Sequence, residues 1–265
     1  MPQFPLDKAT DLIRLEDNRF KSDAGGSYWN FQSAFGGWAL ALAYSAVEEA
    51  APQEGALASV TASFLKPLPQ DGLIVDVRSL REGRRTNFYR TEFFADTDAI
   101  EPTFVADLVF SDLRDKPQDY SAKFPTVMAP EDSDRIPDSP GPRFLSKYEQ
   151  RMCLGKAFSK QDQPHSAVWV RDASERPWDA KGLLAASDTP MPRTFFLDPS
   201  PRFGATVQYD LHMHCTPAEL EEQGSDFVLV EANADLVGRG RFSQKTRIWS
   251  RAGKLLAISN QLAFY

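Results

Sequence analysis

The sequence contains little cysteine, little histidine and no long hydrophobic run. Its 265 residues include only two cysteines, Cys153 and Cys215, which exclude a disulfide framework, a four-thiolate zinc site and an iron–sulfur cluster. No stretch approaches the roughly 20 apolar residues of a membrane-spanning helix. The N-terminus also lacks the basic start and apolar core of a secretion signal. We therefore expect a cytoplasmic protein without a membrane partner.

Basic residues are outnumbered by acidic ones. The chain has 37 acidic and 30 basic residues and a net charge of −7, so attraction of the whole surface to nucleic acid is not expected. Of the three histidines, His212 and His214 lie two residues apart, but no third ligand stands at a metal-binding spacing. A nucleophile elbow, a phosphate-binding loop and a dinucleotide fingerprint are all missing. The sequence predicts no metal.

A proline-rich segment divides the chain. Between Asp112 and Pro142, six prolines are interspersed with acidic residues. Because proline removes an amide donor and fixes φ, neither a long helix nor a central strand is expected there. We predict an N-terminal domain over residues 1–111, a linker over 112–142 and a C-terminal domain over 143–265.

The two domains repeat one order of elements. In the first, a helix opens at Phe35-Gly36-Gly37-Trp38, and four strand-like segments follow, at 60–65, 73–80, 86–95 and 104–110. In the second, an apolar run at 183–188 precedes four more, at 205–214, 227–236, 241–250 and 255–264. The turn pairs Gly83-Arg84 and Gly238-Arg239 correspond, with a small insertion expected at 217–225.

One helix and four antiparallel strands bury their apolar faces if the sheet curls around the helix. Two such α+β units can join edge to edge and protect each other's exposed strands. The predicted fold class is therefore α+β, a double hotdog with one continuous sheet.

Several polar side chains are candidates for chemistry. Asp188 either caps a helix or turn, or loses hydration against an apolar wall and becomes a base with a raised pKa. Gln261 lies among small apolar residues, so it either pairs with the backbone or orients a ligand or water. Strict alternation over 205–214 predicts that Thr206 shares a strand face with Gln208, Asp210, His212 and His214. That face is either half-exposed or part of a pocket.

Arginines gather at one predicted turn. Arg81, Arg84 and Arg85 stand close together in a chain of net negative charge. They are either a solvated charge run or a group that binds phosphates.

Motifs in both halves resemble the acyl-CoA thioesterase II (TesB-like) family. They are Phe35-Gly36-Gly37-Trp38, Phe64-Leu65-Lys66-Pro67, Arg81-Glu82-Gly83-Arg84, Ala186-Ser187-Asp188, Ala205-Thr206-Val207 and the segment from Gly253 to Gln261. The resemblance implies a double-hotdog hydrolase of acyl-CoA, with CoA entering only as part of the substrate and no cofactor. It implies that Asp188, Thr206 and Gln261 hold and activate the attacking water.

From this resemblance we predict one active site per chain. Gly36 and Gly37, at a helix start, would face Asp188 and donate to the thioester oxygen, while Arg81, Arg84 and Arg85 would contact the CoA phosphates. Two alternatives remain open: a hotdog hydratase or dehydratase using His212 or His214, and a non-catalytic acyl-CoA-binding module. Free sheet edges favour a homodimer.

Overall fold

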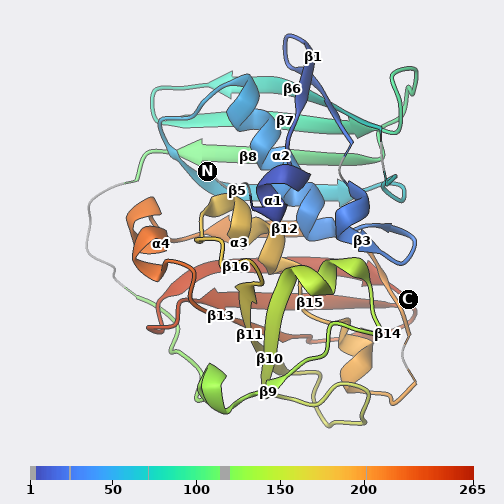
Figure 1. Ribbon diagram of the computed structural model, residues 1–265, viewed down its shortest axis with the longest axis vertical. Helices are drawn as coiled ribbons and strands as arrows, with labels where there is room; N and C mark the ends of the chain where they lie inside the picture. Colours follow the sequence, from blue (N-terminus) through green and yellow to red (C-terminus); the bar gives the residue numbers. More distant parts are fainter. Residues whose placement is uncertain (1–3, 24, 71, 114–119, 201) are drawn as a thin grey trace.

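The computed structural model describes residues 4–23, 25–70, 72–113, 120–200 and 202–265. One antiparallel sheet runs through the molecule, and helices cover one of its faces (Figure 1). In the N-terminal half its strands are β1 (Ile13–Glu16), β2 (Arg19–Ser22), β5 (Ala56–Phe64), β6 (Leu73–Glu82), β7 (Thr86–Phe94) and β8 (Phe104–Ser111). In the C-terminal half they are β9 (Asp134–Arg135), β10 (Tyr148–Leu154), β11 (Ser166–Asp172), β12 (Ala205–Met213), β13 (Val228–Asn233), β14 (Val237–Gly238), β15 (Arg241–Trp249) and β16 (Leu255–Phe264).

The strand order is symmetric about the centre of the sheet. It reads β1-β2-β6-β7-β8-β5-β12-β16-β15-β13-β11-β10-β9, so β5 and β12 join the halves and the order outward from each is the same. Asp210 pairs with Thr61 in the middle of this junction. The arrangement confirms the double hotdog, because each half closes the open edge of the other.

The main helices are α2 (Gly36–Ala50) and α3 (Ala180–Ser187), which pack against each other on the sheet. Alanine and leucine dominate α2, and these residues favour a helix and allow close packing. The shorter α3 is followed by Pro190 and Pro192, which cannot continue a helix. Shorter elements complete the chain: α1 (Pro5–Ala9), η1 (Gly25–Tyr28), the hairpin β3 (Trp29–Asn30) and β4 (Ser33–Ala34), η2 (Pro130–Asp132), η3 (Arg143–Lys147) and η4 (Arg193–Phe196).

The insertion expected at 217–225 is the helix α4 (Pro217–Gln223). Thr216 and Glu219 form a capping box at its start, and Pro217 occupies its first position.

The sequence patterns missed the strands that precede each main helix. Strands β2 and then β1 extend the sheet beyond β6, and strands β11 and then β10 extend it beyond β13. The sequence of β1, Ile13-Arg14-Leu15-Glu16, alternates apolar and charged residues, but the segment is only four residues long and every one of them is exposed. Within the segment predicted as a linker, β9 pairs with β10 at the sheet edge, while its residues 114–119 lie outside the described part.

Across the described residues, no helix is long and apolar enough to cross a membrane.

Candidate active site

The site lies where the first turn of α2 meets the end of α3. Helix α2 has no side-chain cap of its own at Phe35. Instead the amide of Gly37 donates to Oδ2 of Asp188 across 3.1 Å, linking residues 151 positions apart. A carboxylate is favoured there, because the first amides of a helix lack intrahelical partners and carry partial positive charge. The capping role considered for Asp188 is therefore real, but the helix that it caps belongs to the other half.

The end of α3 is fixed to the sheet beside this contact. The hydroxyl of Tyr209 lies 2.8 Å from Oγ of Ser187 and 3.0 Å from Oγ of Ser259, within hydrogen-bonding distance of both. Thr189 donates from its hydroxyl to the carbonyl of Ala186. These bonds hold Asp188, the C-cap residue of α3, in a defined position.

Gln261 connects the carboxylate to a hydroxyl. Its Nε2 donates to Oδ1 of Asp188 at 3.1 Å and to Oγ1 of Thr206. Its Oε1 accepts a 2.8 Å hydrogen bond from Nε2 of Gln244, the residue paired with it on β15. The structure therefore brings Asp188, Thr206 and Gln261 together, and the network sets the orientation of the Gln261 amide.

Thr206 reaches this network because strand β12 is irregular. Its register against β16 shifts between Thr206 and Gln208, where a β-bulge interrupts the alternation. The prediction that Thr206 shares a face with Gln208, Asp210, His212 and His214 is therefore wrong. A bulge inserts one extra residue and re-aims the side chains before it, which turns Thr206 towards Gln261.

The environment of Asp188 changes its acidity. Burial among protein atoms raises the pKa of its carboxyl to about 7, although the hydrogen bonds from Gly37 and Gln261 act in the opposite direction. Among the described residues, the donors to Asp188 are the neutral amides of Gly37 and Gln261, so no cation lowers the pKa of this carboxyl. A carboxyl group with this pKa can gain and lose a proton near neutral pH.

The two glycines are needed for close packing. A Cβ on Gly37 would lie 2.2 Å from the carbonyl oxygen of Ala185, so α2 and α3 could not approach. A Cβ on Gly36 would lie 2.6 Å from Oδ2 of Asp188 and 3.2 Å from the ring of Phe64. The amide of Gly37 is already bonded to Asp188. This corrects the expectation that both glycine amides are free to donate to a thioester oxygen.

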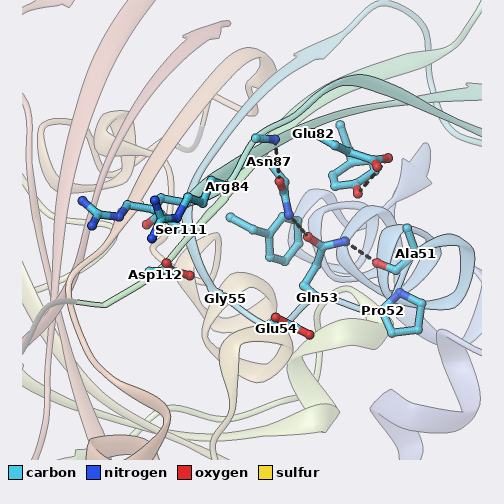
Figure 2. Close-up of a pocket in the computed structure, with 14 residues that line it drawn as sticks. Ala51, Pro52, Gln53, Glu54, Gly55, Glu82, Arg84, Asn87, Ser111 and Asp112 are labelled. Carbon is cyan, nitrogen blue, oxygen red and sulfur yellow. Dashed lines mark hydrogen bonds between the residues drawn. The ribbon is translucent and has the colours of Figure 1, made fainter.

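The predicted phosphate-binding arginines lie elsewhere. Arg84 and Arg85 line a pocket of about 330 Å³ beyond the C-terminal end of α2 (Figure 2). Its polar groups are bonded to one another: Asn87 donates to Gln53 at 3.1 Å and accepts from the amide of Gly83. Because α2 has 15 residues, about 20 Å separates this end from Asp188. Arg81, on the same turn, does not line the pocket.

The histidines lie apart from Asp188. His212 is half exposed and lies 3.3 Å from Asp210, and His165 lies 3.1 Å from Glu231. Within the ranges that the structure describes, no group of three or more histidine, cysteine, aspartate or glutamate side chains is arranged to hold a metal ion.

Sequence reasoning missed two residues that support the site. Gln244 is almost completely buried on β15, and a glutamine at an inward position of an alternating strand could have indicated its role. Arg193, also buried, donates to the carbonyls of Met191, Pro164 and Ala232 and thereby ties η4, which follows Asp188, to the sheet. No signal in the sequence distinguishes Arg193 from a surface arginine.

Fold and site together define a fused double-hotdog protein with a polar site where its halves meet. The family model for the acyl-CoA thioesterase N-terminal domain matches residues 26–111, and that for the acyl-CoA thioesterase C-terminal domain matches residues 125–265. The chain therefore belongs to the acyl-CoA thioesterase family. This membership supports hydrolysis of acyl-CoA thioesters in general.

Solved structures show the same architecture over the whole chain. A conserved hot dog fold protein of unknown function from Alicyclobacillus acidocaldarius is 26% identical, with a TM-score of 0.92, covering 98% of this chain and 97% of that one. A putative thioesterase II from Thermobifida fusca is 20% identical (TM-score 0.84; 100% and 98% covered). The acyl-CoA thioesterase II TesB2 from Mycobacterium marinum is 17% identical (TM-score 0.77; 98% and 97% covered). Among curated proteins, none matches this chain significantly.

Proposed function

We propose that the protein hydrolyses acyl-CoA thioesters with a water molecule activated by Asp188. The observation that carries the proposal is the convergence of Asp188, Gln261 and Thr206 at the first turn of α2. A carboxylate whose pKa is raised to about 7 by burial is suited to act as a general base near neutral pH.

In the proposed reaction, Asp188 removes a proton from water as the water oxygen attacks the thioester carbonyl carbon. The carbon–sulfur bond of the resulting tetrahedral intermediate then breaks, and CoA leaves as a thiolate that takes up the proton held by Asp188, which regenerates the base. A thiol with a pKa near 8.5 can leave without a strong general acid. Because water itself attacks the thioester, the reaction needs no acyl-enzyme intermediate.

Thr206 and Gln261 have different roles in this proposal. Both amide hydrogens of Gln261 are used, one by Asp188 and one by Thr206, so Gln261 is a positioning residue. Because Thr206 accepts from Gln261, its own hydroxyl hydrogen remains available to donate to the water or the substrate.

The positive end of α2 supports charge on the thioester oxygen. Gly36 directly precedes Gly37, whose amide donates to Asp188. Because Gly36 has no side chain, space remains beside Oδ2 of Asp188. We assign the donation to the developing oxyanion to the Gly36 amide, one of the helical amides without an intrahelical acceptor.

A panel of acyl-CoAs of graded chain length, assayed by release of free thiol, tests the proposal. We expect turnover of at least one chain length. With a base of pKa about 7, kcat/KM should rise with pH and level off above that value. Binding of CoA esters without thiol release would contradict hydrolysis and favour the binding module, and hydration of enoyl-CoA would favour the hydratase.

A further inference from the structure

Two tyrosine hydroxyls near the site have no hydrogen-bond partner. The side chains of Tyr28 and Tyr148 are buried, with 0% and 6% of each residue exposed. Neither hydroxyl has a partner among the described residues. Buried hydroxyls are normally satisfied, so this pair is available to bind a polar group of a ligand.

Both tyrosines belong to a wall beside the first turn of α2. The carbonyl of Tyr28 accepts a 2.8 Å hydrogen bond from the amide of Phe35, the residue that opens α2. The ring of Phe35 stacks on Phe144 with centroids 4.0 Å apart. Phe144 lies in η3, which runs directly into Tyr148 at the start of β10. The wall therefore begins two residues before Gly37, the residue that holds Asp188.

Burial keeps the two phenols protonated, and nearby carboxylates add to the effect. Burial raises the pKa of Tyr148, and the neighbouring Tyr28, Asp172 and Asp188 add to the increase, whereas Arg176 acts in the opposite direction. Burial likewise raises the pKa of Tyr28, and Asp172 contributes. Asp172 is itself engaged by the amide of Ser174 at 2.8 Å. Both hydroxyls are therefore hydrogen-bond donors, and the two carboxylates disfavour a negatively charged ligand group.

We propose that Tyr148, together with Tyr28, donates hydrogen bonds to a neutral oxygen substituent, a hydroxyl or keto group, on the acyl part of the thioester. This inference rests on the proposed function and adds a substrate class to it. A site that contains buried donors rejects a ligand without the matching acceptor, because the donors stay unpaired. The enzyme is then selective for oxygen-substituted acyl groups over plain alkyl ones.

Matched pairs of substrates test this selectivity. Each saturated acyl-CoA from four to ten carbons is compared with its 3-hydroxy counterpart, and the selectivity is the ratio of the two kcat/KM values. We expect the wild-type protein to favour the hydroxylated member at the preferred length. The variant Tyr148→Phe should lower the ratio about 10- to 100-fold, as expected for one buried hydrogen bond.

Tyr44→Phe provides the matched control. Tyr44 lies further along α2, partly buried, with its ring 6.0 Å from that of Phe110, and its loss should leave the ratio unchanged. Thermal unfolding separates recognition from a structural role. Removing an unpartnered hydroxyl should leave the melting temperature of Tyr148→Phe unchanged or raise it, whereas a structural hydroxyl, bonded for example to a resident water, would lower it.

An unchanged ratio in Tyr148→Phe, with or without a lower melting temperature, overturns the assignment while leaving hydrolysis intact. If the wild-type protein releases no thiol from any substrate, the proposed function fails instead. The same pairs are then compared by ligand-induced thermal shift, where a larger shift for the hydroxylated member that is lost in Tyr148→Phe still supports the proposal. Equal shifts or none overturn it.

Discussion

Because the two halves of the sheet are symmetric, the site around Asp188 has an equivalent position at the other end of the helices α2 and α3. The site and this counterpart differ in almost every side chain. The bulge that follows Thr206 has an equivalent between Leu57 and Ser59. Gln261 pairs with the residue that lies one position beyond the bulge in β12. Leu108 pairs with the residue at the same position beyond the bulge in β5. Thr206 and Gln261 thus correspond to Leu57 and Leu108, both buried and apolar.

The position of Asp188 also has an equivalent. Asp188 is the ninth residue after Asp179, the N-cap of α3, and Tyr44 is the ninth after Phe35, the N-cap of α2. Burial, and after it the charges of Glu48 and Asp179, raise the pKa of Tyr44, as expected if it lies near the start of α3. At the three corresponding positions the counterpart therefore carries a tyrosine and two leucines in place of the carboxylate, the amide and the hydroxyl of the site.

Carboxylates near the start of α3 are paired with cations instead. Asp179 caps α3 by accepting from the amide of Gly182, and Arg176 binds both Asp179 and Asp7 at distances down to 2.6 Å. Lys181 adds a second cation to Asp7. Burial alone would raise the pKa of Asp7, but these hydrogen bonds lower it. The start of α3 thus has its own cap and nearby cations, whereas the start of α2 is capped by a carboxylate from the other half that has no cation partner and keeps a raised pKa.

The largest expected effect comes from removing that carboxylate. Asp188→Asn keeps the shape of the side chain but loses the base, so kcat should fall by a factor of about 10² to 10⁴. Steady-state thiol release gives the rate, and circular dichroism checks the fold. Unchanged turnover would show that Asp188 takes no part in the mechanism and that the site and its counterpart do not differ in function.

The buried carboxyl of Asp188 should make the protein less stable as pH rises, whereas an acid in a salt bridge makes a protein more stable as pH rises. The pKa of Asp188 is about 7 in the folded protein against an ordinary value of 3.8, so between these values the folded state binds more protons than the unfolded state. The wild-type protein should therefore lose stability relative to Asp188→Asn as pH rises from 4 to 7. The loss is on the order of 2–4 kcal/mol, at about 1.4 kcal/mol per pKa unit. Urea unfolding of both proteins at pH 4.5 and pH 8 measures it, and a constant difference would contradict the raised pKa.

A substitution can make the site resemble its counterpart. Gln261→Leu installs the residue found at Leu108 and releases both Asp188 and Thr206, so kcat should fall about 10- to 100-fold through lost positioning. Gln208→Leu, on the exposed face of β12, is the control and should retain full activity. If both variants behave alike, Gln261 has no special role.

The smallest effect is expected at the pocket beyond the C-terminal end of α2. If Arg84 and Arg85 contact CoA phosphates, replacing both with alanine should raise KM about two- to tenfold at low salt, with kcat unchanged. Arg78→Ala, an exposed arginine of β6 outside the pocket, controls for general charge. Equal KM values for both variants would indicate that this end takes no part in substrate binding.

Local patterns predicted much of the fold. Alternating hydrophobicity and turn residues located the four strands that follow each helix. Half-buried strands alternate apolar and polar residues, and tight turns favour particular residue types, so both can be recognised in the sequence. The outer strands β1 and β10 were missed because β1 has only four residues, all of them exposed, and β10 does not alternate strictly between apolar and polar residues. The turn of Thr206 towards Gln261 was also missed, because a bulge is set by pairing with a distant strand.

The sequence by itself determined the duplicated α+β architecture and supplied the residue types from which a site can be built. Only the tertiary structure decided that Asp188 caps a helix of the other half, that Gln244 orients Gln261, and that the arginine pocket and Asp188 lie at opposite ends of α2. Hydrophobic periodicity is a local property of the chain, whereas hydration, pKa and hydrogen-bond direction depend on neighbours that only folding brings together.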